Sequence, residues 1–257
     1  MHPIERLRFV ARASGADPGL LVRETASALG AFRDDPQGLV TACRRILDRQ
    51  PTSAPLWWLA SRVLTAADPM PEAWAAVDEL ESDPTVYELG RQLPHGATVV
   101  VVDDSGSVVD ALGGRSDLEV LAVDCMMPLD VGDHVFDVSP GGLGPAVAEA
   151  DIVVVMARGV GPDHFVAGTG ARAATSVARL SSATTWLVAG VGHLLPGRVW
   201  EALESRLHRG QEPWEADHEV VPLELIDRVV GPGGPRPVAE AQKRVDCPIA
   251  PELFKEL

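Results

Sequence analysis

The hydrophobic pattern of this chain changes near Pro94, and this change constrains the fold more than any single motif. Before Pro94, apolar residues recur at helical spacing. After it come short, β-branched and almost continuously apolar runs, in the order ATVVVVDD, LEVLAVD, HVFDVS, DIVVVMA and TTWLVAG. Strands that are buried on both faces of a parallel sheet have this composition. The sequence therefore predicts an α/β protein in which a helical domain precedes a parallel-sheet domain.

Repeated Asp-Pro pairs mark helix starts in the first part of the chain. In DPGLLVRETASALGAF and DPQGLVTACRRILDRQ, Asp17 and Asp35 are expected to be N-caps, each followed by proline at the first helical position. The segments APLWWLASRVLTAA and PEAWAAVDELES carry further helical stripes. Three tryptophans in these segments are expected to pack the helices together: Trp57, Trp58 and Trp74.

Helical patterns also lie between several of the predicted strands, at SVVDALGG, LGPAVAEA and GARAATSVARLSS. A further helix, PGRVWEALESRLHRG, precedes a predicted last strand and short helix in HEVVPLELIDRVV, and GPGGPRP is expected to be a loop. One connection is too short for this pattern. Between AVDCMMP and HVFDVS only residues 129–133 remain, whereas a parallel crossover needs about ten residues or more. Either a helix is missing here, or one of the two runs is not a parallel strand.

Composition excludes several classes of function. The net charge of −15 argues against a protein that binds nucleic acid directly, which should present a basic face. No apolar run approaches the roughly 20 residues needed to span a membrane. Glu5, Arg6 and Arg8 interrupt any signal-peptide core at the N-terminus, so a cytoplasmic protein is expected.

Motifs for metals and nucleotide cofactors are also missing from the sequence. Its cysteines, Cys43, Cys125 and Cys247, are isolated, and its histidines form no H-E-x-x-H pattern, so neither a disulfide framework nor a structural zinc site is expected. VVVVDDSGSVVDALGG lacks the G-x-G-x-x-G spacing of a dinucleotide site, and no G-x-x-x-x-G-K-[ST] loop occurs. The prediction is therefore no metal and no cofactor.

Residues 150–180 carry the strongest signal for a ligand. An apolar run ends at Met156, and a glycine-rich loop and an arginine-containing helix pattern follow. If Gly168 to Gly170 cap that helix, Arg172 falls in its first turn, where a cation is unfavourable unless an anion is also present. The sequence thus predicts a phosphate-like group among Arg158, Thr169, Gly170 and Arg172. The competing hypothesis is that both arginines pair with the Asp-rich segment 103–137 or with a partner subunit, and hold no ligand.

Taken in order, four segments resemble the family that contains the regulatory subunits of translation initiation factor 2B, methylthioribose-1-phosphate isomerase and ribose-1,5-bisphosphate isomerase. QPTSAPLWWLASRVL (50–64) is similar to the family segment R-P-T-A-V-N-L-x-W-A-L-x-R-M, and HGATVVVVDDSGSVV (95–109) to its strand ending in T-H-[SC]-x-[ST]. Residues 151–180 resemble its G-A-D-x-[IV] strand end and N-K-x-G-T helix start. HEVVPLELIDRVVGPGGP (218–235) resembles its last strand, V-P-x-x-x-[IV]-D.

The resemblance implies a Rossmann-like parallel-sheet domain preceded by an N-terminal helical domain. We therefore predict a helical domain over residues 1–93, a Rossmann-like α/β domain over 94–237 and a C-terminal tail over 238–257. Taking the resemblance together with the predicted helix start, we expect a ligand to contact Ser105, Ser107, Arg158, Gly168, Thr169, Gly170 and Arg172.

Departures from the family pattern concern its chemistry. The isomerases use a Cys and an Asp to interconvert an aldose and a ketose phosphate, and Ser105 and Arg158 stand at those positions here. An arginine cannot exchange a proton near neutral pH, and a serine without a neighbouring base is a poor nucleophile. Gln50 and Met127 replace two arginines of the family motifs, and the upstream R-G-A-P-A loop has no counterpart. The Ser105-x-Ser107 pattern instead resembles the non-catalytic factor subunits.

Three hypotheses follow. The first is a non-catalytic, initiation-factor-2B-like protein with no catalytic residues, which forms a homodimer and binds a small phosphorylated ligand (a sugar phosphate or nucleotide) or a protein partner. The second is a sugar-phosphate aldose-ketose isomerase with a rearranged active site, for which Cys125 is the candidate nucleophile. The third is a structural subunit of an oligomer with an empty pocket.

Overall fold

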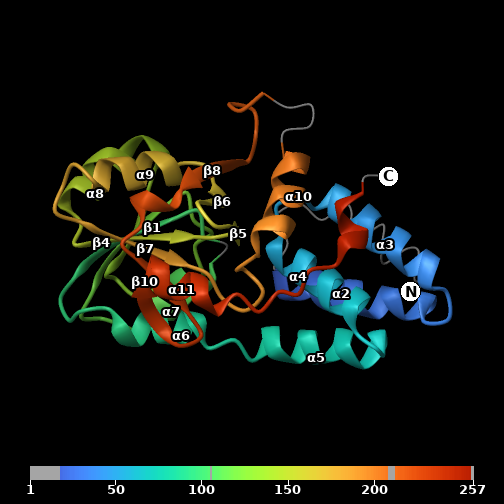
Figure 1. Ribbon diagram of the computed structural model, residues 1–257. Coiled ribbons are helices and arrows are strands. Elements are labelled where there is room, and N and C mark those ends of the chain that lie inside the picture. Colours follow the sequence, from blue (N-terminus) through green and yellow to red (C-terminus); the bar gives the residue numbers. More distant parts are fainter. Residues whose placement is uncertain (1–17, 105, 208–211, 256–257) are drawn as a thin grey trace.

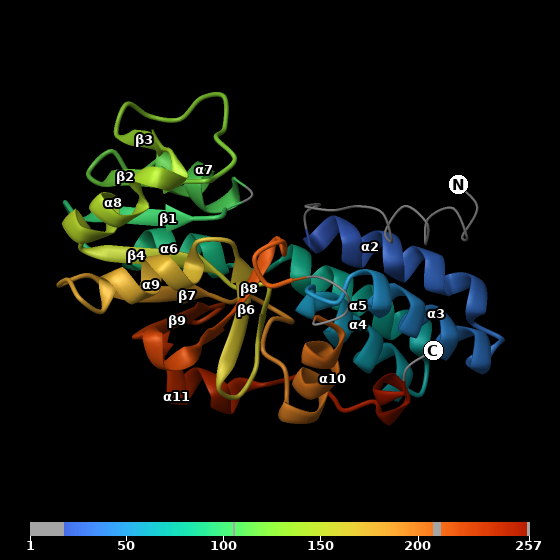
Figure 2. The same cartoon turned by 90° about the horizontal axis from the view of Figure 1, so that it is seen from above.

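The computed structural model describes residues 18–104, 106–207 and 212–255. A helical part and a part built around a twisted sheet lie side by side (Figure 1). Figure 2 shows the strands of the sheet directed toward the helical part, so that the carboxyl edge of the sheet faces the helices. Within the described residues, no helix is both long and apolar enough to cross a membrane.

The predicted helices are present in the N-terminal part: α2 (Pro18–Leu29), α3 (Pro36–Arg49), α4 (Ala54–Thr65) and α5 (Pro69–Glu81). Asp35 is the N-cap of α3, and its Oδ1 accepts a hydrogen bond from Gly38 N at 2.9 Å. Asp17, the other predicted cap, lies outside the described residues. Trp57 and Trp58 are fully buried among the helices, as expected, but Trp74 is 43% exposed, so the packing role predicted for it is wrong.

The main sheet has seven strands in the order β10-β9-β7-β4-β1-β2-β3, and only β10 is antiparallel to its neighbour. This confirms the predicted α/β fold with a mostly parallel sheet. The strands are β1 (Thr98–Val102), β2 (Glu119–Val123), β3 (Val135–Val138), β4 (Ile152–Met156), β7 (Thr184–Val188), β9 (Arg228–Gly231) and β10 (Gly234–Pro237).

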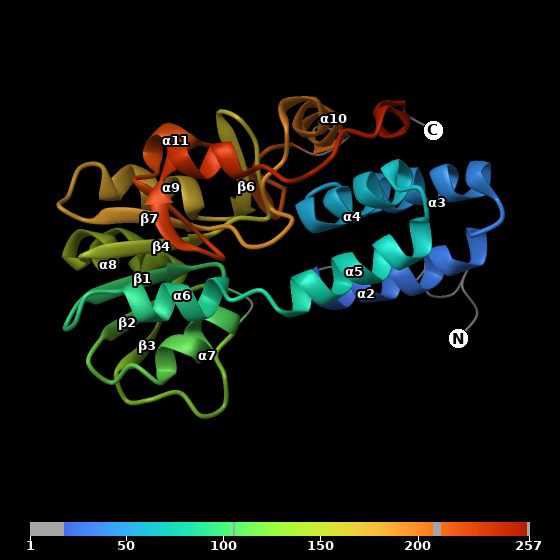
Figure 3. The same ribbon diagram turned by 60° about the horizontal axis from the view of Figure 1, so that its bottom comes forward.

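Helices cover both faces of this sheet (Figure 3). One face packs against α6 (Thr85–Gln92) and α7 (Ser107–Gly113), and the other against α8 (Leu143–Glu149) and α9 (Ala171–Ala178). Alternate valines of β1 enter the two cores, with Val99 and Val101 on the α6–α7 side and Val100 and Val102 on the α8–α9 side. Burial on both faces explains why the strand sequences are continuously apolar.

The short connection between β2 and β3 crosses over without a helix. Both strands are parallel, with Leu121 opposite Phe136, and residues 124–134 between them are irregular. Met127 and Val131 of this segment pack against the core on the α6–α7 side. The first of the two alternatives, a missing helix, is therefore correct, and an extended segment takes part of its place.

Two other segments differ from the sequence prediction. The predicted last strand is divided: β8 (His218–Pro222) and η3 (Leu223–Leu225) precede β9, and β8 belongs to a second, antiparallel sheet with β5 (Gly159–Val160) and β6 (His164–Gly168). The glycine-rich loop expected after Met156 is thus largely a β-hairpin. GPGGPRP is not a plain loop either, because it contains β10, which turns back on β9 with Gly234 at φ +79°.

Contacts cross both predicted domain boundaries. Helix α6, which the prediction assigned to the helical domain, packs against the sheet through the buried Leu89. Helix α10 (Gly197–Leu207) and the segment after α11 (Val238–Ala241) return to the helical part, where Leu203, Cys247 and Leu253 join its core. The division into 1–93, 94–237 and 238–257 stays a prediction.

Candidate functional site

The predicted ligand residues that the structure describes lie at the carboxyl edge of the sheet, where Arg158 contacts the start of α4. Arg158 follows β4, and its backbone connects two parts of the fold: its carbonyl accepts from Ala54 N at 2.9 Å, and its N–H donates to Val166 at 2.7 Å. Asp103 follows β1 with φ +52°, a left-handed conformation that is uncommon for a residue with a side chain. These backbone constraints hold both side chains at the same edge.

Two carboxylates surround the guanidinium group of Arg158. Its Nη2 lies 3.2 Å from Asp103 Oδ2, and its Nη1 lies 3.6 Å from Asp217 Oδ2. Burial raises the pKa of Asp103 in spite of the opposing effect of Arg158. Burial also opposes ionisation of Asp217, but the hydrogen bond with His218 and the charge of Arg158 lower its pKa overall. The positive charge of Arg158 is therefore balanced within the protein.

Asp103 also connects Arg158 to Gly168, the last residue of β6. A Cβ atom added at Gly168 would lie 1.5 Å from Asp103 Oδ2, so the carboxylate rests directly on the glycine backbone. Only glycine leaves room for this contact. The structure thus brings Arg158 and Gly168 together, as predicted, but around an internal carboxylate.

Asp104 occupies the start of α7. It is 2% exposed, and its Oδ2 accepts hydrogen bonds from the backbone N–H groups of Val108 and Val109, each at 2.9 Å. Ser107 Oγ lies 3.2 Å from Asp104 Oδ1 and donates to it. Ser105 lies outside the described residues. Sequence reasoning missed the role of Asp104, although an Asp shortly before a helix is a recognisable capping signal.

Glu219 occupies the start of α9, where the phosphate-like group was predicted. Its Oε1 accepts from Gly170 N at 3.2 Å and its Oε2 from Arg172 N at 2.8 Å. The guanidinium group of Arg172 donates to the carbonyl of Val220, and Thr169 is exposed. Gly170, the N-cap, has φ +91°. Pairing of β6 with β8 sets Ala167 opposite Glu219 and so delivers the carboxylate to the helix.

A cavity of about 360 Å³ lies beside this helix start. Among its described lining residues, Arg172 and Glu219 carry opposite charges, so this cavity has no excess of positive charge. The lining consists of Arg172, Leu207, Pro213, Ala216, His218, Glu219 and Val220.

Cys125 does not have the properties of a nucleophile. Its Sγ lies 3.4 Å from Asp104 N, which donates to it, and 3.4 Å from the carbonyl oxygen of Val101. Burial raises the pKa of this thiol to about 12. A thiol with such a pKa stays protonated at neutral pH, whereas the thiolate is the reactive form. In the part of the chain that the structure describes, no group of three or more His, Cys, Asp or Glu side chains is arranged to hold a metal ion.

Internal carboxylates thus take the groups that could hold an anion around Arg158 and at the starts of α7 and α9. Arg158 is held by Asp103 and Asp217, the start of α7 by Asp104, and the start of α9 by Glu219. An incoming phosphate would have to displace Glu219 or approach several negative charges.

Comparisons with known proteins agree on the fold. No protein-family model and no curated protein sequence matches this chain. Among solved structures, translation initiation factor eIF-2B from Pyrococcus horikoshii OT3 superposes with a TM-score of 0.73 at 15% identity, covering 93% of this chain and 98% of that chain. The tetrameric eIF2B-beta2-delta2 complex from C. thermophilum gives 0.73 at 14% identity, covering 94% of this chain and 92% of that chain.

An enzyme has a similar fold as well. The 5-methylthioribose 1-phosphate isomerase from Pyrococcus horikoshii OT3 superposes with a TM-score of 0.63 at 14% identity, covering 92% of this chain and 85% of that chain. At these identities the comparisons establish a shared fold, and it is the fold that the sequence resemblance implied. Whether this chain catalyses a reaction depends on the residues of its own site.

Proposed function

We propose that this chain is a cytoplasmic, non-catalytic protein of initiation-factor-2B-like fold, which acts by binding a protein partner. The observation that carries the proposal is that carboxylates of the protein itself pair with the groups in the predicted crevice that could bind an anion. Arg158 pairs with Asp103 and Asp217, and Glu219 accepts the backbone N–H groups at the start of α9. A crevice in this state is poorly suited to a small phosphorylated ligand, the other binding partner that the sequence suggested.

The residues at the two proton-handling positions of the related isomerases also favour a non-catalytic role. Arg158 stands where those enzymes have an Asp, and it cannot act as a general acid or base near neutral pH. Cys125, the remaining candidate nucleophile, has a thiol pKa raised to about 12 by burial. An isomerase with a rearranged active site is therefore the less-supported alternative.

Support for a protein partner comes from the fold and from the edge of the sheet. A solved structure of similar fold is a tetrameric complex. In this chain β3 is the last strand of the sheet, and Phe136 on it is 46% exposed. Met126 and Leu129, in the segment that precedes β3, are also exposed. Exposed apolar side chains on an edge strand and on the segment that leads to it are typical of an interaction surface. We propose a second copy of this chain as the partner.

Light scattering coupled to size-exclusion chromatography tests the partner, and a thermal-shift screen with sugar phosphates and nucleotides tests the ligand. We expect a dimer whose mass falls to that of a monomer when Phe136 is replaced by Asp. Any thermal shift by a small molecule should be the same in wild type and in Arg172→Gln, because Arg172 lies at the start of α9 in the predicted crevice. Tyr87→Asp is the matched control, because Tyr87 is 69% exposed and lies on α6, away from β3. A wild-type monomer, together with a shift by one sugar phosphate that is lost in Arg172→Gln, would contradict the proposal.

A further inference from the structure

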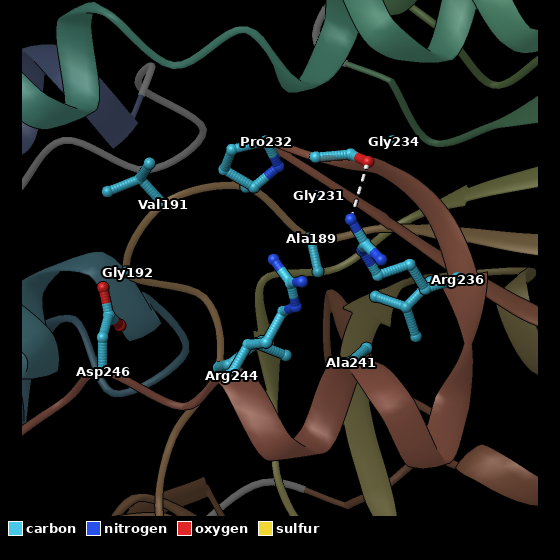
Figure 4. Close-up of a pocket in the computed structure, with 14 residues that line it drawn as sticks. Ala189, Val191, Gly192, Gly231, Pro232, Gly234, Arg236, Ala241, Arg244 and Asp246 are labelled. Carbon is cyan, nitrogen blue, oxygen red and sulfur yellow. Dashed lines mark hydrogen bonds between the residues drawn. The ribbon is translucent and has the colours of Figure 1, made fainter.

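A second cavity lies at the same edge of the sheet but at the other end of the strand order, beyond the carboxyl ends of β7 and β9 (Figure 4). Its volume is about 210 Å³. In open α/β sheets, ligands bind in crevices outside the carboxyl ends of the strands. None of the predicted ligand residues that the structure describes lines this cavity, so it is separate from the crevice around Arg158.

Glycine-rich backbone forms two sides of the cavity. Residues 189–192 follow β7, and residues 231–234 form the turn between β9 and β10. The first of these loops is held by Asp83: Val191 N donates to Asp83 Oδ2 at 2.8 Å, and a Cβ at Gly190 would meet the same oxygen at 2.0 Å. Gly192 has φ +74°. The loop is therefore fixed in place, with Asp83 packed against Gly190 and the ring of Trp58 against Gly192.

Two arginines supply the charge of this cavity. Arg236 extends from β10 and Arg244 from η4 (Gln242–Arg244), and both side chains point into it (Figure 4). Arg236 donates to the carbonyl of Gly233 at 3.3 Å. Among the described residues, neither guanidinium group has a carboxylate within ion-pair distance. Arg158, by contrast, has two carboxylate partners.

One carboxylate, Asp246, also lines the cavity, on the side of Gly192 (Figure 4). Burial raises its pKa, and the nearby charge of Glu79 adds to the effect. It forms no ion pair with Arg236 or Arg244. Two guanidinium groups that lack a carboxylate partner among the described residues thus converge on one cavity, in a chain whose net charge is −15.

We propose that this cavity binds the phosphoryl group of a small phosphorylated molecule, held between Arg236 and Arg244. Guanidinium groups are planar forks that match the oxygens of a phosphoryl group, and such charge-assisted hydrogen bonds are among the strongest in proteins. The volume suits a phosphoryl group with a small attached body rather than a dinucleotide. This inference goes beyond the proposed function and does not depend on it, because an anion can bind here whether or not the crevice at Arg158 is closed.

Isothermal titration calorimetry with inorganic phosphate tests the proposal, at constant ionic strength set with sodium chloride. We expect saturable binding at one site per chain. Since a hydrogen bond to a charged group contributes about 1.5–3 kcal/mol, Arg236→Gln and Arg244→Gln should each weaken binding about tenfold or more. Asp246→Asn should strengthen it, because that change removes the negative charge of the acidic residue among the described lining residues.

Two control variants distinguish binding at this cavity from binding elsewhere on the chain. Arg45→Gln removes an exposed arginine of α3 and should leave phosphate binding unchanged. Arg172→Gln should also leave it unchanged, because Arg172 lies at the start of α9. Absence of saturable binding at millimolar phosphate would overturn the proposal. Equal binding by wild type and the Arg236 and Arg244 variants would do so too, as would loss of binding only in Arg172→Gln, which would place the anion at the start of α9.

Discussion

The guanidinium group of Arg158 lies 3.2 Å from the carboxylate of Asp103, and this ion pair joins the ends of β4 and β1. Neighbouring parallel strands bring their carboxyl ends to one edge, so residues 55 positions apart in the sequence meet there. In the isomerase motif that the sequence resembles, a carboxylate stands at the position of Arg158. Here the position carries a cation whose charge the protein itself balances.

The first prediction is the absence of isomerase activity. Loss of one general acid or base typically lowers a rate by about 10²–10⁴-fold, and here both family positions differ. Purified protein should therefore not convert methylthioribose 1-phosphate or ribose 1,5-bisphosphate measurably above background, as followed by phosphorus NMR. The 5-methylthioribose 1-phosphate isomerase of similar fold is the positive control for the first substrate. Turnover near about 1 per second, an ordinary enzymatic rate, would show that the non-catalytic proposal is wrong.

The second prediction concerns Glu219 at the start of α9. Replacing Glu219 by Ala frees the N–H groups of Gly170 and Arg172, which should lower the free energy of unfolding by about 1 kcal/mol, the usual effect of losing a helix cap. The freed helix start should also gain affinity for phosphate. Urea unfolding and phosphate titration measure the two effects.

The titration for Glu219→Ala is best made with Arg236 and Arg244 already replaced by Gln, so that the second cavity does not contribute. Glu224→Ala is the matched control, since Glu224 is exposed on η3. If both variants bind phosphate equally weakly, Glu219 does not block an anion site.

Local sequence patterns predicted most strands of the main sheet, the cap of α3 and the missing crossover helix. The strands β1, β2, β4 and β7 were visible because burial on both faces requires continuous apolar runs, whereas the edge strand β3 was predicted from a similar run although Phe136 is exposed. Asp35 was recognisable as a helix cap because its partner, Gly38, is three residues away. The missing crossover helix followed from the number of residues available.

Contacts between segments that are distant in the sequence could not be predicted from local sequence patterns. The second sheet depends on pairing of β6 with β8, about 50 residues later, and a two-residue strand such as β5 carries no periodic signal. The placement of Glu219 on the start of α9 depends on the register of that pairing. The same limit explains why the cavity between Arg236 and Arg244 was missed: its walls come from three separate segments, and the GPGGPRP turn was interpreted as a loop.

The third prediction compares the adjacent Asp103 and Asp104. Asp104→Ala removes the acceptor of two buried N–H groups and should lower the free energy of unfolding by about 1–2 kcal/mol. Asp103→Asn should change it by less than about 1 kcal/mol, because Asn tolerates a positive φ and Arg158 keeps Asp217 as a partner. Urea unfolding of both variants at neutral pH is the measurement.

The pH dependence of Asp103→Asn follows from the direction of the pKa shift. The pKa of Asp103 is raised in the folded protein, so between its unfolded and folded pKa values the folded state binds more protons. In that range the wild type loses stability as the pH rises, and the Asn variant lacks this loss. The free energy of unfolding of the variant, taken relative to that of the wild type, should therefore be higher at neutral pH than at a pH below the unfolded pKa. If the relative stability of the variant instead falls as the pH rises through this range, the pKa of Asp103 is not raised.

The fourth prediction concerns Arg206 of α10, whose side chain is 1% exposed. It donates to Asp48 at 2.7 Å and to the carbonyl of Leu253 at 3.0 Å, and it lies over the ring of Trp57. Arg206→Gln leaves the carboxylate of Asp48 without its partner, and breaking a buried pair costs about 3–5 kcal/mol. Arg198→Gln, on the exposed side of the same helix, should lower stability by no more than about 1 kcal/mol in the same urea assay, since it removes only an exposed ion pair and a cation–π contact with Phe254. Equal effects would exclude a structural role for the buried pair.

The last prediction concerns the segment after residue 238, which the sequence suggested to be a tail. Leu253 is fully buried in the core of the helical part, whereas Ile249, in the same segment, is 48% exposed. Leu253→Ala should therefore lower the free energy of unfolding by about 2–5 kcal/mol, because it removes buried methyl groups and leaves a cavity. Ile249→Ala, which removes apolar carbons from a half-exposed position, should cost well under half of that.

The comparison is made by urea unfolding, with circular dichroism and tryptophan fluorescence followed together, since Trp57 and Trp58 report on the same core. If the two substitutions cost the same small amount, the segment does not contribute to the core and is a tail, as the sequence suggested. If only Leu253→Ala is costly, the helical part needs residues from both ends of the chain to complete its core.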